Sequence, residues 1–300
     1  MRILVYGAGV QGCELAHRLL QNKKNVVTLL ARGEWKERID QRGLVIRSML
    51  QFRTTTDRVA TIDTLAPDDC YDLVFVAMQA GQLPQVLPIL KQNKSEYFVF
   101  LGNDPDAVGV LRAMQRPADK IAFGFQNTAG RREPDRLVSV HTSVGMTVGG
   151  TYYDDMDEWL KCHIAFILPI VYVCYAVNGD LTRSTVEQRK AIVDAAWECC
   201  EMLKAAGVPV NDAENTDYYR EGTKKRKQTD RMVYWMCQTP IGKWCASDHA
   251  MHAMGEMQYL DEAFEALRAN TQVSMTAWDD LRRGMPNWKT LQLRYGKRKE

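Results

Sequence analysis

The sequence lacks several patterns that would point to a metal ribbon, a secreted framework or a nucleic-acid partner. None of its eight cysteines forms a CxxC pair, so we expect reduced thiols, no disulfide and no metal site of that kind. The net charge of +2 provides no broad basic field. The local run "KKRK" at 224–227 is more typical of a solvated loop than of a phosphate contact. No nucleic-acid partner is predicted.

Long apolar segments are also absent. The longest run, at 164–177, has about 14 residues, contains a proline, and falls short of the roughly 20 residues that a helix needs to cross a bilayer. The first residues pass from "ILVY" directly to glycine, without the apolar stretch and cleavage site of a secretory signal. We therefore expect a soluble, cytoplasmic protein with no membrane partner.

What the sequence does contain is a change of pattern near its middle. Up to about residue 150, short apolar runs alternate with helical segments, which predicts a parallel sheet wrapped by helices. The runs are "RILVYG", "NVVTLLAR", "YDLVFVAM", "YFVFLGN" and "KIAFGF", and residues 138–149 read as a late strand. Beyond this point, residues 156–177, 184–207 and 247–269 have helical spacing. The sequence thus predicts an α/β N-terminal domain of Rossmann type at 1–150, followed by a mostly α-helical substrate or dimerisation domain at 151–300.

The first apolar run ends in the glycine-rich loop "GAGVQG". Gly7 would make the tight turn, Gly9 would let the backbone approach a pyrophosphate, and Gly12 would allow close packing of helix on strand. Val10 and Gln11 lie between them in the first turn of the expected helix, whose N-terminus attracts phosphate. A purely structural turn is the alternative. The position directly after a strand favours a dinucleotide.

The residue after the second strand selects the dinucleotide. NAD-binding proteins usually carry an acid there, which accepts a hydrogen bond from the ribose 2′-hydroxyl. This chain has Arg32, with Lys36 just beyond. Because a guanidinium suits a 2′-phosphate, the sequence favours NADP over NAD; a surface arginine is the alternative.

Taken in order, "ILVYGAGVQGCELAHRLL", "VVTLLARG", "GLVIRS", "DLVFVAMQAGQL" and "FLGND" resemble the ketopantoate reductase family over about the first 110 residues. The resemblance implies a Rossmann domain followed by a helical domain, NADPH at the glycine loop, and reduction of a 2-keto acid such as 2-dehydropantoate in the cleft between domains. Asn103 matches the family's cofactor-binding asparagine. Gln79 stands where the family often has lysine, which leaves Arg32 with more of the phosphate charge to neutralise.

The catalytic half matches the family less well. "WLKCHIAFILP" retains the W-x-K pattern at Trp159 and Lys161, and counting from the tryptophan makes Lys161 the catalytic lysine. The family's asparagine is missing, however, and Pro169 sits one residue early. Counting back from the proline places Leu160 at the lysine position.

A second departure lies near the end of the chain. "VSMTAWDDLRRGMPNW" is similar to the family's Ser-Met segment at Ser274. The glutamate expected about a dozen residues later is missing, and Pro286 and Asn287 stand near its position. The family's chemistry is therefore not matched residue by residue.

The segment "SDHAMHAMGEM" resembles an H-A-x-x-A-x-x-E-M signature in a divergent branch of reductase-like proteins. At this spacing we expect His249, His252 and Glu256 to share one helix face. Metal binding is disfavoured because HxxH is not the zincin spacing and no cysteine completes the set. The remaining hypotheses are a pair lining the cleft that orients a carboxylate substrate, and plain helix-surface residues.

The reaction expected from these features is NADPH-dependent reduction of a small 2-keto acid. Lys161 would polarise the carbonyl oxygen and donate the proton, with His249 and Glu256 as further catalytic candidates. Asn103 would contact the nicotinamide side and the substrate, and His163 and Ser274 are further substrate-binding candidates.

Two other hypotheses stay open. One is an opine-type reductase or dehydrogenase that uses His163 or His249 as the acid. The other is an NADP-binding regulatory protein that has lost catalysis, which the missing glutamate would suit. All three hypotheses are compatible with a homodimer.

Overall fold

The computed structural model describes residues 1–141, 146–148 and 155–295. The chain divides into two compact units, Met1–Asp157 and Glu158–Glu300. The domain boundary predicted between residues 150 and 151 lies outside the described residues.

A seven-stranded sheet forms the centre of the first unit, with strand order β11-β8-β7-β6-β1-β2-β5. Five neighbouring pairs are parallel, and only β11 runs antiparallel to its neighbour β8. The five apolar runs predicted as strands are all confirmed in this sheet. Its strands are β1 (Arg2–Tyr6), β2 (Val26–Leu30), β5 (Ala60–Ile62), β6 (Leu73–Ala77), β7 (Tyr97–Leu101), β8 (Ile121–Gln126) and β11 (Met146–Val148).

The strand order reverses at β1, as in doubly wound nucleotide-binding folds. The chain passes from β1 through β2 to β5 on one side and then returns to β6 on the other side of β1. One face of the sheet packs against side chains of α1 and α2, and the opposite face against α3 and α4. The helical elements of this unit are α1 (Val10–Leu20), α2 (Gly33–Arg42), η1 (Ala80–Gln82), α3 (Leu83–Gln92), α4 (Ala107–Met114) and η2 (Ala118–Lys120).

A second, four-stranded sheet was not predicted. Its order is β4-β3-β10-β9, built from β3 (Leu44–Ser48), β4 (Arg53–Asp57), β9 (Ala129–Arg132) and β10 (Leu137–Val140). Strands β4 "RTTTD" and β9 "AGRR" are polar and carry no apolar run. The single late strand predicted at 138–149 is wrong: its described residues contribute to β10 in this sheet and to β11 in the main sheet.

The second unit is mostly helical, as predicted, and its first helix, α5, begins two residues before the unit boundary. It contains α5 (Met156–Ala176), η3 (Leu181–Arg183), α6 (Val186–Ala205), η4 (Thr216–Tyr218), α7 (Lys224–Gln238), α8 (Pro240–Gly242), η5 (Lys243–Ser247), α9 (Asp248–His252), α10 (Met254–Arg268), α11 (Thr276–Gly284) and α12 (Trp288–Tyr295). Helix α6 starts with a capping box between Thr185 and Gln188. It ends just before Gly207, whose φ of +87° is typical of a helix stop.

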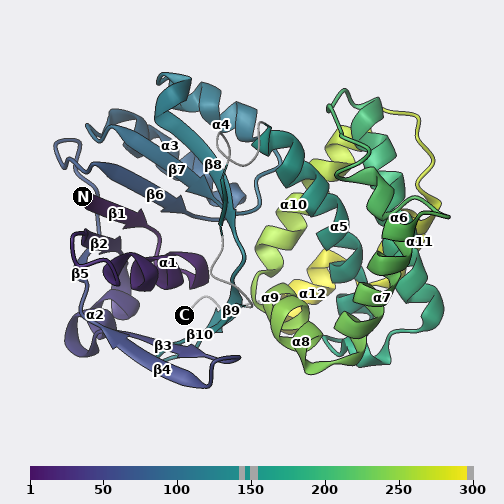
Figure 1. The fold of residues 1–300 in the computed structure, drawn as a ribbon, viewed down its shortest axis with the longest axis horizontal. Helices are drawn as coiled ribbons and strands as arrows, with labels where there is room; N and C mark the ends of the chain where they lie inside the picture. The colour runs from purple at the N-terminus through teal and green to yellow at the C-terminus, as the bar shows by residue number, and fades with distance from the viewer. Residues whose placement is uncertain (142–145, 149–154, 296–300) are drawn as a thin grey trace. The chain divides into compact units, whose positions relative to one another are not determined.

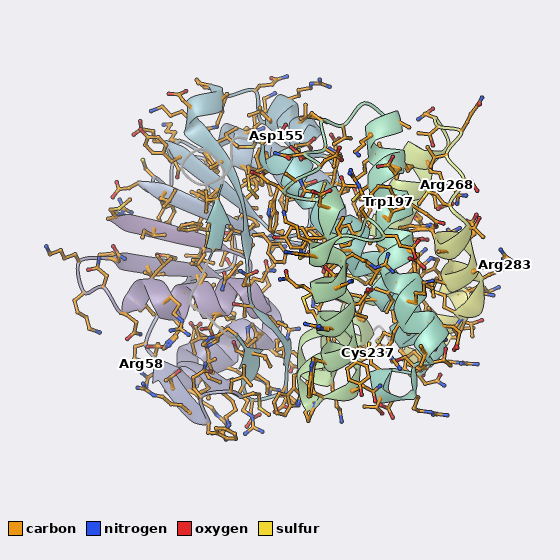
Figure 2. All side chains as sticks on the ribbon, turned by 45° about the vertical axis from the view of Figure 1, so that its right-hand side comes forward. Arg58, Asp155, Trp197, Cys237, Arg268 and Arg283 are labelled. Carbon is orange, nitrogen blue, oxygen red and sulfur yellow. The ribbon has the colours of Figure 1, made fainter. Side chains whose placement is uncertain are left out.

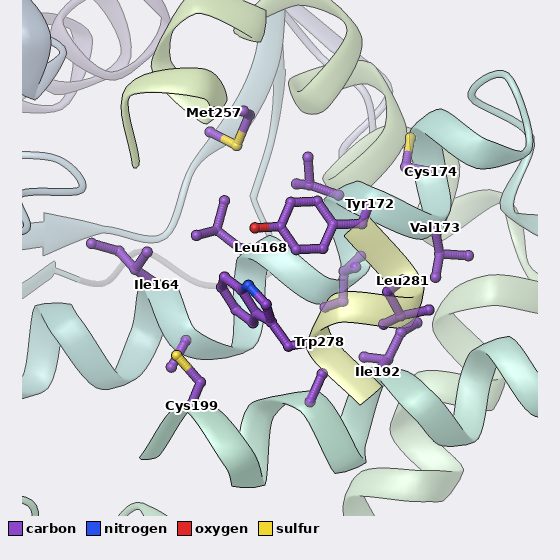
Figure 3. Packing of buried hydrophobic residues seen from close by; sticks show 14 of the residues in the cluster. Ile164, Leu168, Tyr172, Val173, Cys174, Ile192, Cys199, Met257, Trp278 and Leu281 are labelled. Carbon is purple, nitrogen blue, oxygen red and sulfur yellow. The ribbon is translucent and has the colours of Figure 1, made fainter. Parts of the chain in front are cut away.

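The core of this unit forms around aromatic rings from α5 and α11. Figure 3 shows Trp278 and Tyr172 packed among Ile164, Leu168 and Met257. The rings of Trp278 and Tyr172 meet edge to face with centroids 5.2 Å apart. A close contact of this kind adds to the energy of burying the two side chains.

Helix α5 is long and apolar enough, by length and composition, to cross a membrane. The sequence does not predict this, because its longest apolar run, at 164–177, is shorter than the helix. Within the fold, however, 72% of its most apolar window is buried. It is therefore the core helix of this unit. Its cysteines are buried as free thiols, as are the others at positions 13, 199, 200 and 237, while Cys70 is an exposed free thiol.

The run "KKRK" does not lie on a solvated loop as predicted; it forms the first turn of α7. Arg226 is buried, and its guanidinium donates to Asp194 and Asp230, each at 2.8 Å. Another ion pair joins α10 and α11, where both Nη atoms of Arg268, which is labelled in Figure 2, donate to the Asp279 carboxylate. Charged side chains thus contribute to packing in this unit.

Candidate functional site

The glycine loop between β1 and α1 leaves almost no room at two of its glycines. Gly7 has a φ of +119°, and a Cβ there would lie 2.4 Å from the carbonyl oxygen of Ala77 on β6. A Cβ on Gly12 would lie 1.8 Å from the carbonyl oxygen of Gly7. Both glycines are therefore needed to let the start of α1 pack against the ends of β1 and β6.

Gly9 differs from these two. It precedes α1 with extended backbone (φ −80°, ψ −168°), and nothing lies within 4 Å of a Cβ built on it. The first turn of α1 carries no acidic residue, so no carboxylate on that turn competes for the positive end of the helix. An open glycine beside a helix N-terminus fits a pyrophosphate.

The other predicted cofactor residues follow neighbouring strands on the same edge of the sheet. Arg32 lies after β2, Gln79 after β6 and Asn103 after β7. Because these strands are parallel, their carboxyl ends meet at one edge, next to the glycine loop. Asn103 is buried and Gln79 is half-buried. Gln11, in the first turn of α1, reaches toward Gly102, so its Oε1 lies 3.8 Å from a Cβ built there.

The two cations after β2 have different surroundings. Arg32 is exposed, and it donates from Nε to the Asp63 carbonyl oxygen (3.2 Å) and from Nη2 to the Tyr6 hydroxyl (3.3 Å). Lys36 forms an ion pair with Asp40 one turn later (2.7 Å), which raises the pKa of the lysine. Arg32 is thus the cation that the fold presents at this edge.

The second unit brings two predicted histidines near each other. On α5, the His163 ring stacks on Trp159 with centroids 5.1 Å apart and planes 7° apart. Burial, together with the nearby His249, lowers the pKa of His163 to about 4. His249 Nε2 in turn lies 3.9 Å from Oε2 of the buried Glu256. These four residues form what we call the histidine cluster.

Lys161 belongs to a different side of α5. Residues two positions apart in a helix are separated by about 200° around its axis. Lys161 and His163 therefore project to opposite sides of α5. The lysine is only 7% exposed, which excludes the solvated side chain that a lysine near a helix start usually has. Ser274 is exposed before α11, with its hydroxyl 3.4 Å from that of Thr276.

One expectation for this unit is corrected. His249, His252 and Glu256 do not share one continuous helix face, because the chain leaves helical geometry at Ala253 (φ −114°, ψ +32°) between α9 and α10. The break leaves His249 beside Glu256, but the exposed His252 bonds instead to the carbonyl oxygen of Asp248 (2.7 Å).

Asn287, near the position of the missing family glutamate, has a structural role. Its Oδ1 accepts from the backbone N–H of Thr290 (2.9 Å) and caps the start of α12. Within the described ranges, no group of three or more His, Cys, Asp or Glu side chains could hold a metal ion.

The contact between Tyr6 and Arg32 is the feature that the sequence reasoning missed. A phenol hydroxyl at the end of the otherwise aliphatic strand "ILVY" is an unusual side chain to bury there. That hydroxyl was the available signal, but its partner comes from another strand and is not visible in the sequence.

Comparison with known proteins identifies the family of the first unit. Residues 3–151 match the family model described as ketopantoate reductase PanE/ApbA. These residues belong to the ketopantoate reductase family. The ketopantoate reductase region includes the glycine loop, Arg32, Gln79 and Asn103, and it ends before α5. No curated protein sequence matches the chain.

Solved structures extend the likeness of fold over both units. D-mandelate dehydrogenase with NADH and anilino(oxo)acetate has a TM-score of 0.74 at 15% identity, covering 99% of this chain and 100% of that one. The 2-dehydropantoate 2-reductase of Geobacter metallireducens GS-15 has a TM-score of 0.69 at 16% identity, with 95% and 98% covered. The dimeric ketopantoate reductase of Staphylococcus aureus has a TM-score of 0.65 at 11% identity, with 99% and 100% covered. The chain therefore has the fold of nicotinamide-dependent oxidoreductases of this type.

Proposed function

We propose that this protein reduces a small 2-keto acid to the 2-hydroxy acid with NADPH. The observation that carries the proposal is the edge formed by the open Gly9, the uncapped first turn of α1 and the exposed Arg32 guanidinium. Together these groups fit a pyrophosphate and a 2′-phosphate, both of which are anionic.

The residues of the first unit would bind and orient the cofactor. Backbone N–H groups at Val10 and Gln11 would hold the pyrophosphate and Arg32 the 2′-phosphate. Gln79 and Asn103, at the ends of β6 and β7, would hold the remainder of the cofactor. When bound, the nicotinamide supplies a hydride. The fold neighbours include an enzyme solved with NADH and a 2-dehydropantoate 2-reductase, so the preference for NADPH rests on Arg32.

The second unit would supply the proton. Charge develops on the carbonyl oxygen as hydride arrives, and a positioned acid typically speeds such a step by 10² to 10⁴. We propose Lys161 as this acid. His249 and Glu256 belong to the histidine cluster, on the other side of α5 from Lys161, and we keep them as a second candidate site, where this pair would orient the substrate carboxylate. His163 stays neutral at pH 7 because burial lowers its pKa, which suits a hydrogen-bond partner of the substrate better than a proton donor. Ser274 is a further substrate contact in this proposal.

A panel assay tests the reaction class. We expect purified protein to oxidise NADPH, followed at 340 nm, with at least one of 2-dehydropantoate, an aliphatic 2-keto acid and an aromatic 2-keto acid. An amine added together with the keto acid tests the opine-type alternative, since imine reduction requires both. Tight NADPH binding without turnover on any mixture would contradict the proposal and favour a regulatory protein.

We further propose that the protein is a cytoplasmic homodimer. The support is the fold likeness to an enzyme described as dimeric. Sedimentation equilibrium measures the mass in solution, and a monomer at micromolar concentration would contradict this part.

A further inference from the structure

The guanidinium of Arg32 is held by the ends of two other strands. Its Nε donates to the carbonyl oxygen of Asp63, directly after β5, and its Nη2 donates to the hydroxyl of Tyr6, the last residue of β1. Arg32 itself follows β2, which lies between β1 and β5 in the sheet (Figure 1). Three neighbouring strand ends thus supply one cation and both of its acceptors.

These two bonds determine which edge of the guanidinium stays available. The group has five N–H donors, and paired bonds to a phosphate use either the Nε/Nη2 edge or the Nη1/Nη2 edge. Asp63 occupies the Nε position and Tyr6 takes one hydrogen of Nη2. The guanidinium keeps three donors, two on Nη1 and one on Nη2, and one from each nitrogen is enough for a paired contact with a phosphate.

The position of the Tyr6 hydroxyl is itself fixed by packing. The side chain is only 1% exposed, and its ring lies in the core cluster that includes Leu4, Leu30 and Val76. A ring enclosed in this way cannot follow the arginine if the arginine moves. The hydroxyl therefore sets where the outer edge of the guanidinium points.

We propose that Tyr6 is a positioning residue for cofactor discrimination: it holds the Arg32 guanidinium so that its Nη1/Nη2 edge meets the 2′-phosphate of NADPH. The proposal rests on the proposed function, because it takes NADPH as the cofactor. Without the hydroxyl, Arg32 keeps its charge but loses its orientation. The general attraction for an anion then remains, while the paired contact weakens.

The test compares dissociation constants for NADPH and NADH, measured by fluorescence titration. Tyr6→Phe keeps the buried ring and removes the hydroxyl, and we expect it to weaken NADPH about five- to tenfold, the usual size of one such hydrogen bond. Binding of NADH should change less than about twofold. In the Arg32→Gln background, Tyr6→Phe should have no further effect on NADPH, because Tyr6 acts through the guanidinium.

Tyr71→Phe is the matched control. Tyr71 is a buried ring in the same core cluster, so removing its hydroxyl reports any general effect on packing. We expect the ratio of the dissociation constants for NADPH and NADH to stay unchanged. Arg32→Lys provides a second variant that leaves Tyr6 intact. Lysine keeps the positive charge but cannot form the paired contact with a phosphate. This variant should therefore lose preference for NADPH over NADH to an extent similar to that of Tyr6→Phe.

The outcomes separate this inference from the proposed function. A wild-type protein that binds NADH as well as NADPH would overturn the cofactor assignment, and with it the role of Tyr6. A wild-type protein that prefers NADPH, together with a Tyr6→Phe variant of unchanged preference, would overturn the role of Tyr6 alone. An Arg32→Lys variant that prefers NADPH over NADH as strongly as the wild type would also overturn the role of Tyr6.

Discussion

A Cβ on Gly12 would lie 1.8 Å from the carbonyl oxygen of Gly7, so these two glycines fix how closely α1 approaches the end of β1. At Gly9, between them, a Cβ meets nothing within 4 Å. The loop therefore contains glycines of two kinds. Two are needed for packing, and one leaves space at the surface where the pyrophosphate is proposed to bind.

The first prediction uses this difference. Gly9→Val should cost about 1 kcal/mol or less of folding stability and raise the dissociation constant for NADPH at least about a hundredfold, because the side chain fills the pyrophosphate position. Gly12→Ala should instead destabilise the fold by at least about 2 kcal/mol. Urea unfolding and cofactor titration measure the two effects. Normal NADPH binding by Gly9→Val would show that the loop is only structural.

The second prediction concerns the acid. Lys161→Ala should lower kcat about a hundredfold or more and leave NADPH affinity within a factor of a few. Because Lys161 is buried, Lys161→Met serves as a second variant that fills the same space. The comparison variants are His249→Ala and Glu256→Gln, which we expect to keep most of kcat. Loss of kcat in His249→Ala, with most of it kept in Lys161→Ala, would move the acid to the histidine cluster.

The third prediction concerns pH. The pKa of His163 is about 4 in the folded state and about 6.5 in an unfolded chain. The neutral form is therefore favoured by folding, and this contribution is fully present above pH 6.5. It is lost as pH falls toward 4, where the unfolded chain binds a proton that the folded protein does not, and the loss should reach about 2 to 3 kcal/mol.

Urea unfolding between pH 7 and pH 4 measures this loss. His163→Phe keeps a ring on Trp159 and should make the stability fall less steeply with pH. His252→Gln, at an exposed position, should leave the slope as in the wild type. Equal slopes in His163→Phe and the wild type would refute the assignment.

The fourth prediction concerns a buried carboxylate in the helical unit. Asp261 is 0% exposed and accepts hydrogen bonds from Tyr172, Trp288 and two nitrogens of Arg282, at 2.5 to 2.9 Å. Asp261→Asn should destabilise this unit by about 3 to 5 kcal/mol, since it breaks a buried pair and turns an amide donor toward other donors. Asp280→Asn, which breaks the exposed pair with Arg283, should cost less than about 1 kcal/mol. Equal losses of stability in the two variants would contradict the role assigned to Asp261.

The parts of the fold that the sequence predicts are those with a local signal. A continuous apolar run such as "LVFVA" identifies a strand buried on both faces, and glycines after a strand identify the loop. The polar strands β4 and β9 have no such signal. Their sheet forms because Leu137–Val140 pairs with Leu44–Ser48, about 90 residues earlier in the chain, a contact that no local pattern contains.

The candidate site likewise contains residues that have a local sequence signal and contacts that have none. Arg32 is predictable because its position after β2 has a known use, whereas its contact with Tyr6 depends on the pairing of two strands. His249 and Glu256 can be picked out by residue type and spacing. The break at Ala253, which leaves both histidines on α9 and Glu256 on α10, is marked by neither glycine nor proline at that position. Arg226 shows the same limit, because a basic run gives no indication that one member finds acidic partners on α6 and one turn further along α7.

The side chains that donate hydrogen bonds to Asp261 are synthesised at different times. During synthesis, α5 and α10 leave the ribosome before α11 and α12, which carry Arg282 and Trp288. Until those last helices emerge, Tyr172 is the partner among these three that is already present, and burying the carboxylate then costs several kcal/mol. The stable burial of Asp261 therefore waits for α11 and α12, which follow α10 in the chain.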